Sequence, residues 1–263
     1  PMCIVMELCL IVDTLKRASA KRITVVMTYF AYGRQDRKTK SRVPISASLM
    51  ARLIQEAGAD HVLSIELHSG QIQGFFHIPV DDISVRSVLL KPLETVSFNH
   101  PVAIVAPDAA GSSRAEEFKN YFSEQMNMDT SFAVMNKWKL SDESLGMELV
   151  GKVQGYDCII VDDMIDTGKT LLAAVLELKK SGAQKIYACI THGLFNDHET
   201  LKKLIEAPEL EKLIVTNTLH HTDPEVVSLL EESNGKIVVQ NVGNILAETI
   251  RRIHFEESLV TIH

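Results

Sequence analysis

The sequence predicts an α/β protein whose sheets are mainly parallel. Short runs of apolar, often β-branched residues alternate along the whole chain with longer segments in which apolar residues recur at helical spacing. A run that stays apolar throughout is typical of a strand buried on both faces, as in a parallel sheet covered by helices. Several of these runs end in polar loops, and ligands of open α/β sheets bind at that edge.

The first part of the chain alternates regularly between the two kinds of segment. Ser46 is the expected cap of its second helix, and Gly58 is the expected end. The polar segment 75–86 indicates a boundary between two domains, residues 1–84 and 85–263. The expected helices are 6–19, 44–58 and 85–97, and the expected strands are 23–30, 61–67 and 101–106.

The second part continues the same alternation, without short internal repeats or a low-complexity linker. We therefore expect right-handed crossovers between neighbouring parallel strands. The expected strands are 131–136, 158–161, 185–190, 212–216 and 236–239, and the expected helices are 171–180, 199–206, 224–232 and 245–256.

Composition restricts the classes of function. The 263 residues are 46% hydrophobic and 23% charged, as in ordinary globular proteins, and the formal net charge is -7. This charge argues against nucleic acid or an anionic membrane as a partner, so phosphate binding has to be local. The cysteines, Cys3, Cys9, Cys158 and Cys189, lack zinc-site spacing. They are predicted to be reduced core residues of a cytoplasmic protein.

The central stretch 158–170 carries the clearest sign of a ligand site. A predicted buried strand, 158–161, is followed by Asp162 and Asp163, and the small polar residues 166–170 then lead into a helix. A helix N-terminus favours an anion, and paired carboxylates accept hydrogen bonds from hydroxyls. This combination fits a sugar phosphate. A nucleotide P-loop is excluded because Asp163 occupies the position of its first glycine, but the two acids as mere helix caps remain an alternative.

A basic run follows the strand at 23–30. Five Arg or Lys residues occur between Arg34 and Arg42, and Arg and Gln side chains can together hold phosphate oxygens or a purine edge. A solvated loop is the alternative. The position directly after a strand favours binding.

Two strand ends carry candidate metal ligands. Glu66 and His68 are two residues apart at the end of the strand 61–67, and we expect them on one face. Asp108, after the strand 101–106, is a further candidate, because magnesium takes few protein ligands and completes its shell with water and phosphate oxygens. A purely structural histidine is the alternative. The small residues after Asp108 allow backbone amides to approach a phosphate, with Arg114 in reach.

A third group of cations follows the strand 131–136. Lys137 and Lys139 flank the only tryptophan, and the polar segment 140–145 comes next. We expect a mobile cationic lid or, alternatively, an exposed loop without a role.

Together these stretches resemble the ribose-phosphate pyrophosphokinase (phosphoribosyl pyrophosphate synthetase) family over nearly the whole chain. The most specific segments are YGRQDRK at 32–38, HSGQIQGFF at 68–76, VAPDAAGSSRA at 105–115 and VDDMIDTGKT at 161–170. The resemblance implies two phosphoribosyltransferase-like (Rossmann-like) domains, the N-terminal one apparently incomplete. It also implies Mg2+-dependent transfer of pyrophosphate from ATP to ribose 5-phosphate, with sites at subunit contacts of a homo-oligomer or of a hetero-oligomer with paralogous subunits.

The resemblance assigns expected roles to residues at matching positions. ATP would contact Arg34, Gln35, Asp36, Arg37 and Lys38; magnesium would be held by His68, Asp108 and Glu66; the pyrophosphate loop would comprise Asp108, Ala109, Ala110, Gly111 and Arg114; Lys137 and Lys139 would be catalytic; and ribose 5-phosphate would bind Asp162, Asp163, Asp166, Thr167, Gly168, Lys169 and Thr170.

Some positions depart from the family pattern. Lys139 stands where an Arg is usual, and Lys169 stands where a glycine is usual, as in purine phosphoribosyltransferases. Three functions therefore stay open: an active synthetase, a non-catalytic regulatory subunit that assembles with an active paralogue, and a purine phosphoribosyltransferase.

Overall fold

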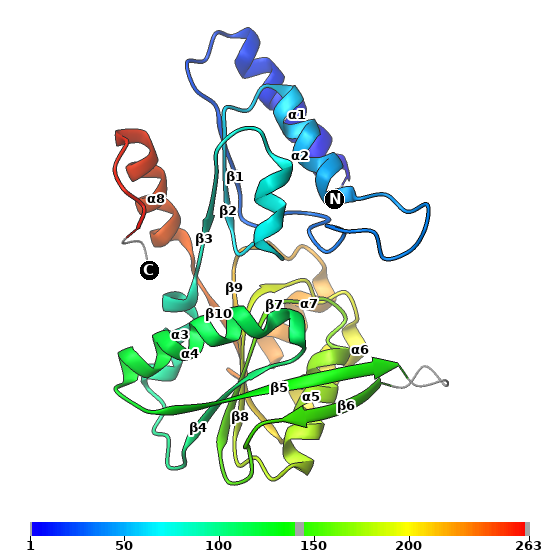
Figure 1. Ribbon diagram of the computed structural model, residues 1–263, viewed down its shortest axis with the longest axis vertical. Coiled ribbons are helices and arrows are strands. Elements are labelled where there is room, and N and C mark those ends of the chain that lie inside the picture. Colours follow the sequence, from blue (N-terminus) through cyan, green and yellow to red (C-terminus); the bar gives the residue numbers. More distant parts are fainter. Residues whose placement is uncertain (1, 140–144, 261–263) are drawn as a thin grey trace. The chain divides into compact units, whose positions relative to one another are not determined.

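The protein folds into two α/β units. The structure is a computed structural model that describes residues 2–139 and 145–260 (Figure 1). The units are Pro1–Ser84 and Val85–His263. In the described part of the chain, every strand pair is parallel except β5 with β6, so the predicted fold class is confirmed.

Within its described residues, the first unit is a three-stranded parallel sheet, in the order β1-β2-β3, with two α-helices and one 3-10 helix. Its core packs Val5 and Val12 of the first helix against Met50 and Ile54 of the second and against Val62 of the middle strand. The elements are α1 (Met2–Arg17), β1 (Thr24–Met27), α2 (Ser46–Ala57), β2 (His61–Ile65), the 3-10 helix η1 (Gly70–Phe75) and β3 (Val80–Ile83).

Two details of this unit differ from expectation. Strand β3 was not predicted, because its sequence VDDI is half acidic; one of these acids is used locally, since Leu67 N donates to Asp82 Oδ1 at 3.0 Å. Ser46 does not cap α2, whose N-cap is Ile45; instead Ala47 N donates to the carbonyl of Gln35 at 3.2 Å. Gly58 ends α2 in the left-handed conformation, as predicted.

The second unit is a seven-stranded sheet in the order β10-β9-β8-β7-β4-β5-β6. Its strands are β4 (Val102–Ala106), β5 (Thr130–Lys139), β6 (Leu145–Val150), β7 (Asp157–Ile165), β8 (Ile186–Gly193), β9 (Leu210–Thr216) and β10 (Ile237–Gln240). Its helices are α3 (Arg86–Glu94), the 3-10 helix η2 (Ala109–Gly111), α4 (Ser112–Met126), α5 (Lys169–Lys180), α6 (His198–Glu206), α7 (Pro224–Glu232) and α8 (Gly243–Phe255).

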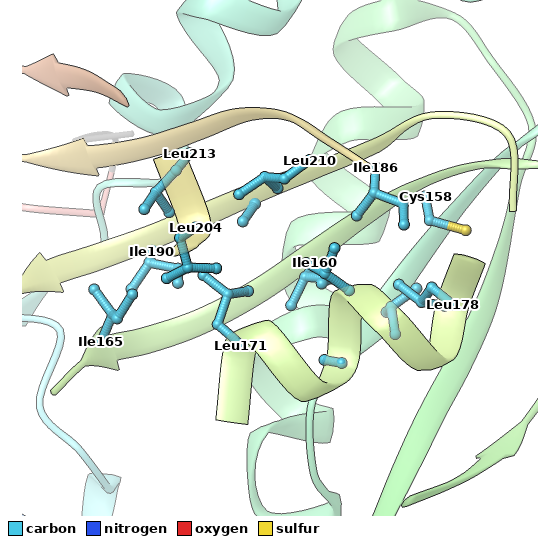
Figure 2. Packing of buried hydrophobic residues seen from close by; sticks show 14 of the residues in the cluster. Cys158, Ile160, Ile165, Leu171, Leu178, Ile186, Ile190, Leu204, Leu210 and Leu213 are labelled. Carbon is cyan, nitrogen blue, oxygen red and sulfur yellow. The ribbon is translucent and has the colours of Figure 1, made fainter. Parts of the chain in front are cut away.

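One apolar cluster fixes α5, α6 and α7 on the sheet of this unit. It contains alternate residues of β4, Ala103 and Val105, together with residues of β7, β8 and β9. Figure 2 shows Ile160 of β7 close to Leu171 and Leu178 of α5. Because strand residues alternate between faces, the remaining residues of β4 face α4, which packs against β4 and β7. The central strands are thus covered on both faces.

The loop expected at 137–139 is a strand. The backbone of Lys137, Trp138 and Lys139 belongs to β5 and pairs antiparallel with β6, Lys139 opposite Leu145. The prediction of a lid at these residues is therefore wrong for their backbone, since pairing with the unpredicted strand β6 extends β5. The remainder of the predicted lid, 140–144, lies outside the described residues.

The cysteines follow the prediction only in part. Cys158 and Cys189 are buried, and desolvation raises the pKa of the Cys158 thiol to about 12, with the nearby Asp157 adding to the rise. Cys9 is half-buried, but Cys3 is exposed on α1 and is no core residue. Among the helices of residues 2–139 and 145–260, none combines the length and hydrophobicity that a membrane crossing requires.

Candidate functional site

In the first unit, the basic run and the segment after β2 lie together. The buried carboxylate of Asp36 accepts hydrogen bonds from Ser69 Oγ and Gln71 Nε2, both at 2.7 Å. Burial raises the pKa of Asp36, but these two hydrogen bonds and the charge of His68 outweigh it, so that the pKa lies below its usual value. Asp36 thus ties the predicted ATP segment to the predicted metal segment.

The neighbours of Asp36 in the basic run are exposed. Arg34, Gln35, Arg37 and Lys38 all lie on the surface of the first unit. The first turn of α2 also holds Gln35, because Ser46 Oγ donates to the Gln35 side chain and Ala47 N donates to the Gln35 carbonyl. The run therefore has a fixed centre at residues 35–36 and cationic side chains on its outside, as an anion-binding surface requires.

Glu66 and His68 do not share a strand face. Strand β2 ends at Ile65, and Glu66 adopts a left-handed conformation with φ of 45°, so the expected alternation stops before this pair. Ser84 Oγ donates to Glu66 Oε1 at 2.7 Å. Within the described residues, no three His, Cys, Asp or Glu side chains are grouped as a metal cluster. The metal roles of Glu66, His68 and Asp108 stay predictions.

In the second unit, the loop after β4 meets the acids of β7. Asp108 Oδ1 accepts a hydrogen bond from Gly111 N at 3.0 Å and so closes the turn formed by Ala109, Ala110 and Gly111. A Cβ added to Gly111 would lie 3.9 Å from Asp162 Oδ1. The predicted pyrophosphate loop and the predicted sugar site are therefore in contact.

The two acids lie inside β7 rather than after it. Strand β7 continues to Ile165 because it pairs with β8 up to Gly193, whereas its pairing with β4 ends at Ile160. Asp162 and Asp163 therefore follow the end of the neighbouring strand β4, next to the start of α4. The prediction that the buried strand ends at Val161 is correct on the β4 side only.

Arg114 of α4 approaches both carboxylates. Its Nη1 lies 3.5 Å from Asp163 Oδ1 and 3.9 Å from Asp162 Oδ1. Asp163 is almost completely buried, whereas 25% of the Asp162 side chain is exposed. Desolvation and the negative charge of Asp163 raise the pKa of Asp162, although the exposed part of its side chain lets solvent moderate the rise. Asp162 is thus the acid that is open to a ligand.

The segment 166–170 leads from β7 into α5, as predicted. Thr167 and Lys169 are exposed, and Thr170 is half-buried in the first turn of the helix. Gly168 is the N-cap with φ of 78°, and a Cβ there would lie 3.1 Å from both Leu204 Cδ1 and Thr200 Cγ2 of α6. Only glycine fits this position without strain. The first amides of α5 have no partner within the helix and are available to an anion.

A second loop supports this segment, and the sequence interpretation missed it. Residues 194–197 connect β8 to α6; Asn196 Nδ2 donates to Asp166 Oδ1 at 2.7 Å, and Asn196 N donates to the carbonyl of Asp166 at 2.9 Å. Lys169 Nζ lies 3.4 Å from Asp197 Oδ2. The available signal was position: Asn196 and Asp197 are polar residues that follow a predicted strand at the same sheet edge.

Comparisons with known proteins cover nearly the whole chain. A family model described as "N-terminal domain of ribose phosphate pyrophosphokinase" matches residues 3–58, and one described as "Phosphoribosyl synthetase-associated domain" matches residues 103–263. Ribose-phosphate pyrophosphokinase 2 of Schizosaccharomyces pombe is 40% identical over 257 residues, which are 97% of this chain and 76% of that protein.

A bacterial relative and a solved structure agree with these matches. Ribose-phosphate pyrophosphokinase of Aquifex aeolicus is 41% identical over 249 residues, which are 94% of this chain and 75% of that protein. The crystal structure of phosphoribosylpyrophosphate synthetase from Mycobacterium smegmatis superimposes with a TM-score of 0.83 at 34% identity, covering 96% of this chain and 78% of that one.

Proposed function

Because this chain belongs to the ribose-phosphate pyrophosphokinase family, we propose that it transfers the β,γ-pyrophosphoryl group of ATP to the 1-hydroxyl of ribose 5-phosphate. The products are phosphoribosyl pyrophosphate and AMP. The observation that carries the proposal is the arrangement in the second unit: a partly exposed acid, Asp162, lies next to Arg114 and is followed by a glycine-capped loop at the start of α5.

Ribose 5-phosphate binds along this arrangement in the proposal. Its phosphate lies at the loop 166–170, where the amides of α5 and the hydroxyls of Thr167 and Thr170 donate. Its hydroxyls donate to Asp162. Asp163 serves mainly to hold Arg114, because its carboxylate is buried against that guanidinium. The neighbouring turn 108–111 then receives the pyrophosphoryl group through the amides of Ala109 and Ala110, because the amide of Gly111 donates to Asp108.

ATP binds the basic run of the first unit in the proposal. Arg34, Gln35, Arg37 and Lys38 contact the nucleotide, and Asp36 fixes the run rather than touching the ligand, because its carboxylate is buried and hydrogen-bonded to Ser69 and Gln71. The exposed Arg and Lys side chains neutralise the negative charge of the nucleotide phosphates.

Magnesium is the proposed cofactor. In the second unit, Asp108 is the proposed ligand, because it supplies a carboxylate, the donor type that magnesium prefers. In the first unit, His68 is the better candidate donor, because Glu66 accepts a hydrogen bond from Ser84. Bound magnesium would neutralise charge on the pyrophosphoryl group. Lys137 and Lys139 remain the proposed cations for the charge that develops during transfer.

An assay of AMP tests this function directly. The purified chain is incubated with ATP, ribose 5-phosphate and magnesium, and the expected result is stoichiometric formation of AMP and phosphoribosyl pyrophosphate that stops when EDTA removes the metal. Substrate binding without AMP formation would favour the non-catalytic subunit. Release of pyrophosphate from phosphoribosyl pyrophosphate and a purine base would favour a phosphoribosyltransferase.

A further inference from the structure

The loop between β8 and α6 holds the phosphate loop by several independent contacts. Leu194 N donates to the carbonyl of Ile165 at 2.8 Å, and Asn196 N donates to the carbonyl of Asp166 at 2.9 Å. Two side-chain contacts continue the series, Asn196 Nδ2 to Asp166 Oδ1 at 2.7 Å and Lys169 Nζ to Asp197 Oδ2 at 3.4 Å. The backbone contacts hold the part of the turn before Gly168, and the side-chain contact of Lys169 lies after it.

This supporting loop is itself anchored. Phe195 is buried, with its ring against Gly193 and 5.4 Å from the ring of His221. Phe195 also adopts φ of 53°, a conformation that a non-glycine residue holds only when its surroundings impose it. Asp197 caps α6, accepting from Thr200 N at 3.0 Å, and this hydrogen bond keeps the pKa of Asp197 below its usual value. Asn196 and Asp197 therefore extend from a fixed base.

We propose that Asn196 and Asp197 are positioning residues that set the conformation of the phosphate loop 166–170 for ribose 5-phosphate. This inference rests on the proposed function of that loop. Asn196 acts on the first half of the turn through Asp166, and Asp197 acts on the second half through Lys169. Without these two residues, the loop has to become ordered when ribose 5-phosphate binds, and this ordering reduces the affinity.

The Asn196 contact carries most of the expected effect. It joins an amide to a carboxylate, so the hydrogen bond is charge-assisted, and Asn196→Asp replaces the donor with a second negative charge at the same place. Both contacts are exposed, but Lys169 Nζ lies 3.4 Å from Asp197 Oδ2 whereas the Asn196 contact measures 2.7 Å, so the ion pair is the looser of the two and contributes less. We therefore expect Asn196→Asp to be the most damaging variant, Asn196→Ala to follow, and Asp197→Asn, which retains an acceptor for Thr200 N, to be mild.

Backbone hydrogen exchange of the ligand-free protein tests the contact itself. Asn196→Ala should accelerate exchange of the hydrogen-bonded amides of residues 172, 194 and 196, which donate to the carbonyls of residues 168, 165 and 166, while the control Ser123→Ala should not. Ser123 is a suitable control because it also loses one side-chain hydrogen bond, to Thr130 at 2.6 Å, where α4 leads into β5. Unchanged exchange of these three amides in Asn196→Ala would overturn the proposal, whichever ligand the loop takes.

Binding and kinetics test the consequence. Asn196→Ala should weaken ribose 5-phosphate binding roughly three- to tenfold by calorimetry and raise its KM similarly, with the KM for ATP unchanged. If the role of Asn196 were merely structural, the variant would have a lower melting temperature but the same ratio of the KM for ribose 5-phosphate to the KM for ATP. That result would overturn the positioning role. If the unmodified chain binds no ribose 5-phosphate, the proposed function fails and this role fails with it, while the exchange result still decides whether the loops are coupled.

Discussion

At the residue scale, Asp162 and Asp163 have unlike surroundings although they are adjacent. Asp163 is buried against Arg114, whereas Asp162 is partly exposed and receives a hydrogen bond from Asp163 N at 2.9 Å. The Asp162 carboxylate loses part of its hydration and lies next to the negative charge of Asp163, and both effects raise its pKa. Asp162 thus provides a hydrogen-bond acceptor for a ligand, and its negative charge lowers the stability of the folded protein.

Asp162→Asn should therefore raise the melting temperature at neutral pH and weaken ribose 5-phosphate binding. The sign follows from the raised pKa: the folded state favours the protonated carboxyl, so ionisation at neutral pH lowers stability and an uncharged amide removes this penalty. Asparagine also retains an acceptor for Asp163 N. The measurements are thermal unfolding at several pH values and calorimetric titration with ribose 5-phosphate. A variant less stable than the parent at neutral pH would contradict this account.

Gly168→Ala has an almost exact control in the same unit. Gly168 and Gly155 have φ of 78° and 79°, but only at Gly168 would a Cβ contact other residues, those of α6. Gly155→Ala should lower the free energy of unfolding by about 1–2 kcal/mol, the cost of a left-handed alanine. Gly168→Ala should lower it further and alone weaken ribose 5-phosphate binding, as measured by urea unfolding and calorimetry. If the two variants changed the free energy of unfolding and the ribose 5-phosphate affinity equally, the contact between residue 168 and α6 would be unimportant.

At the element scale, one histidine joins the starts of α6 and α7. His198 Nδ1 lies 2.7 Å from Glu225 Oε2, and His198 Nε2 lies 3.2 Å from Asp223 Oδ2. The hydrogen bond with Glu225 raises the pKa of His198, and the charges of Glu225 and Asp223 add to the rise. Asp223 also caps α7, accepting from Glu225 N. The charged histidine therefore links α7 to α6, the helix that follows the supporting loop 194–197.

His198→Gln should reduce stability at acidic pH more than at alkaline pH. Because the folded pKa is raised, the contribution of the charged ring is complete below the ordinary histidine pKa of about 6.5 and is lost as the pH rises through the higher folded value. The difference in melting temperature between variant and parent should therefore be largest near about pH 6 and shrink toward about pH 9.

His77→Gln is the control for this experiment. His77 is exposed in the first unit and makes no ion pair within residues 2–139 and 145–260. The difference in melting temperature between His77→Gln and the parent should therefore not depend on pH. If the difference in melting temperature between His198→Gln and the parent were independent of pH, His198 would have a packing role only.

The elements that the sequence identified best carry clear local signals. Helix α7 begins at Pro224 and ends at Glu232, as the proline and the apolar spacing predict, and β4 and β9 lie within two residues of expectation. The failures are edge strands. Strand β3 is half acidic, and β6 has the antiparallel partner β5, so neither shows the continuous apolar run of a central parallel strand.

At the scale of the whole molecule, each unit has an apolar core of its own. The cluster around Val12, Ile54 and Val62 lies entirely in the first unit, and the cluster around Ile160 and Leu178 entirely in the second. The proposed ATP residues belong to the first unit and the proposed ribose 5-phosphate residues to the second. Binding of the sugar phosphate and transfer of pyrophosphate should therefore be separable.

A fragment of residues 85–263 should unfold cooperatively and bind ribose 5-phosphate, yet form no AMP with ATP. Its own core provides the stability, and the absence of Arg34–Lys38 removes the nucleotide contacts. Circular dichroism melting, calorimetry and the AMP assay measure the three properties, with the full chain as comparator. AMP formation by the fragment would contradict the proposed division of roles.

The sequence alone determined the fold class, the order of most elements and the polar segments at the ends of β1, β2, β4 and β7. Local composition is sufficient for these features, because continuous apolar runs indicate strands buried on both faces and small polar residues indicate turns. Tertiary structure decided the state of individual side chains. The burial of Asp36 and Asp163, the left-handed Glu66 and the support of Asp166 by Asn196 depend on residues far apart in the chain. Local pattern carries no record of such partners, since a carboxylate beside an arginine and one beside water have the same sequence signal.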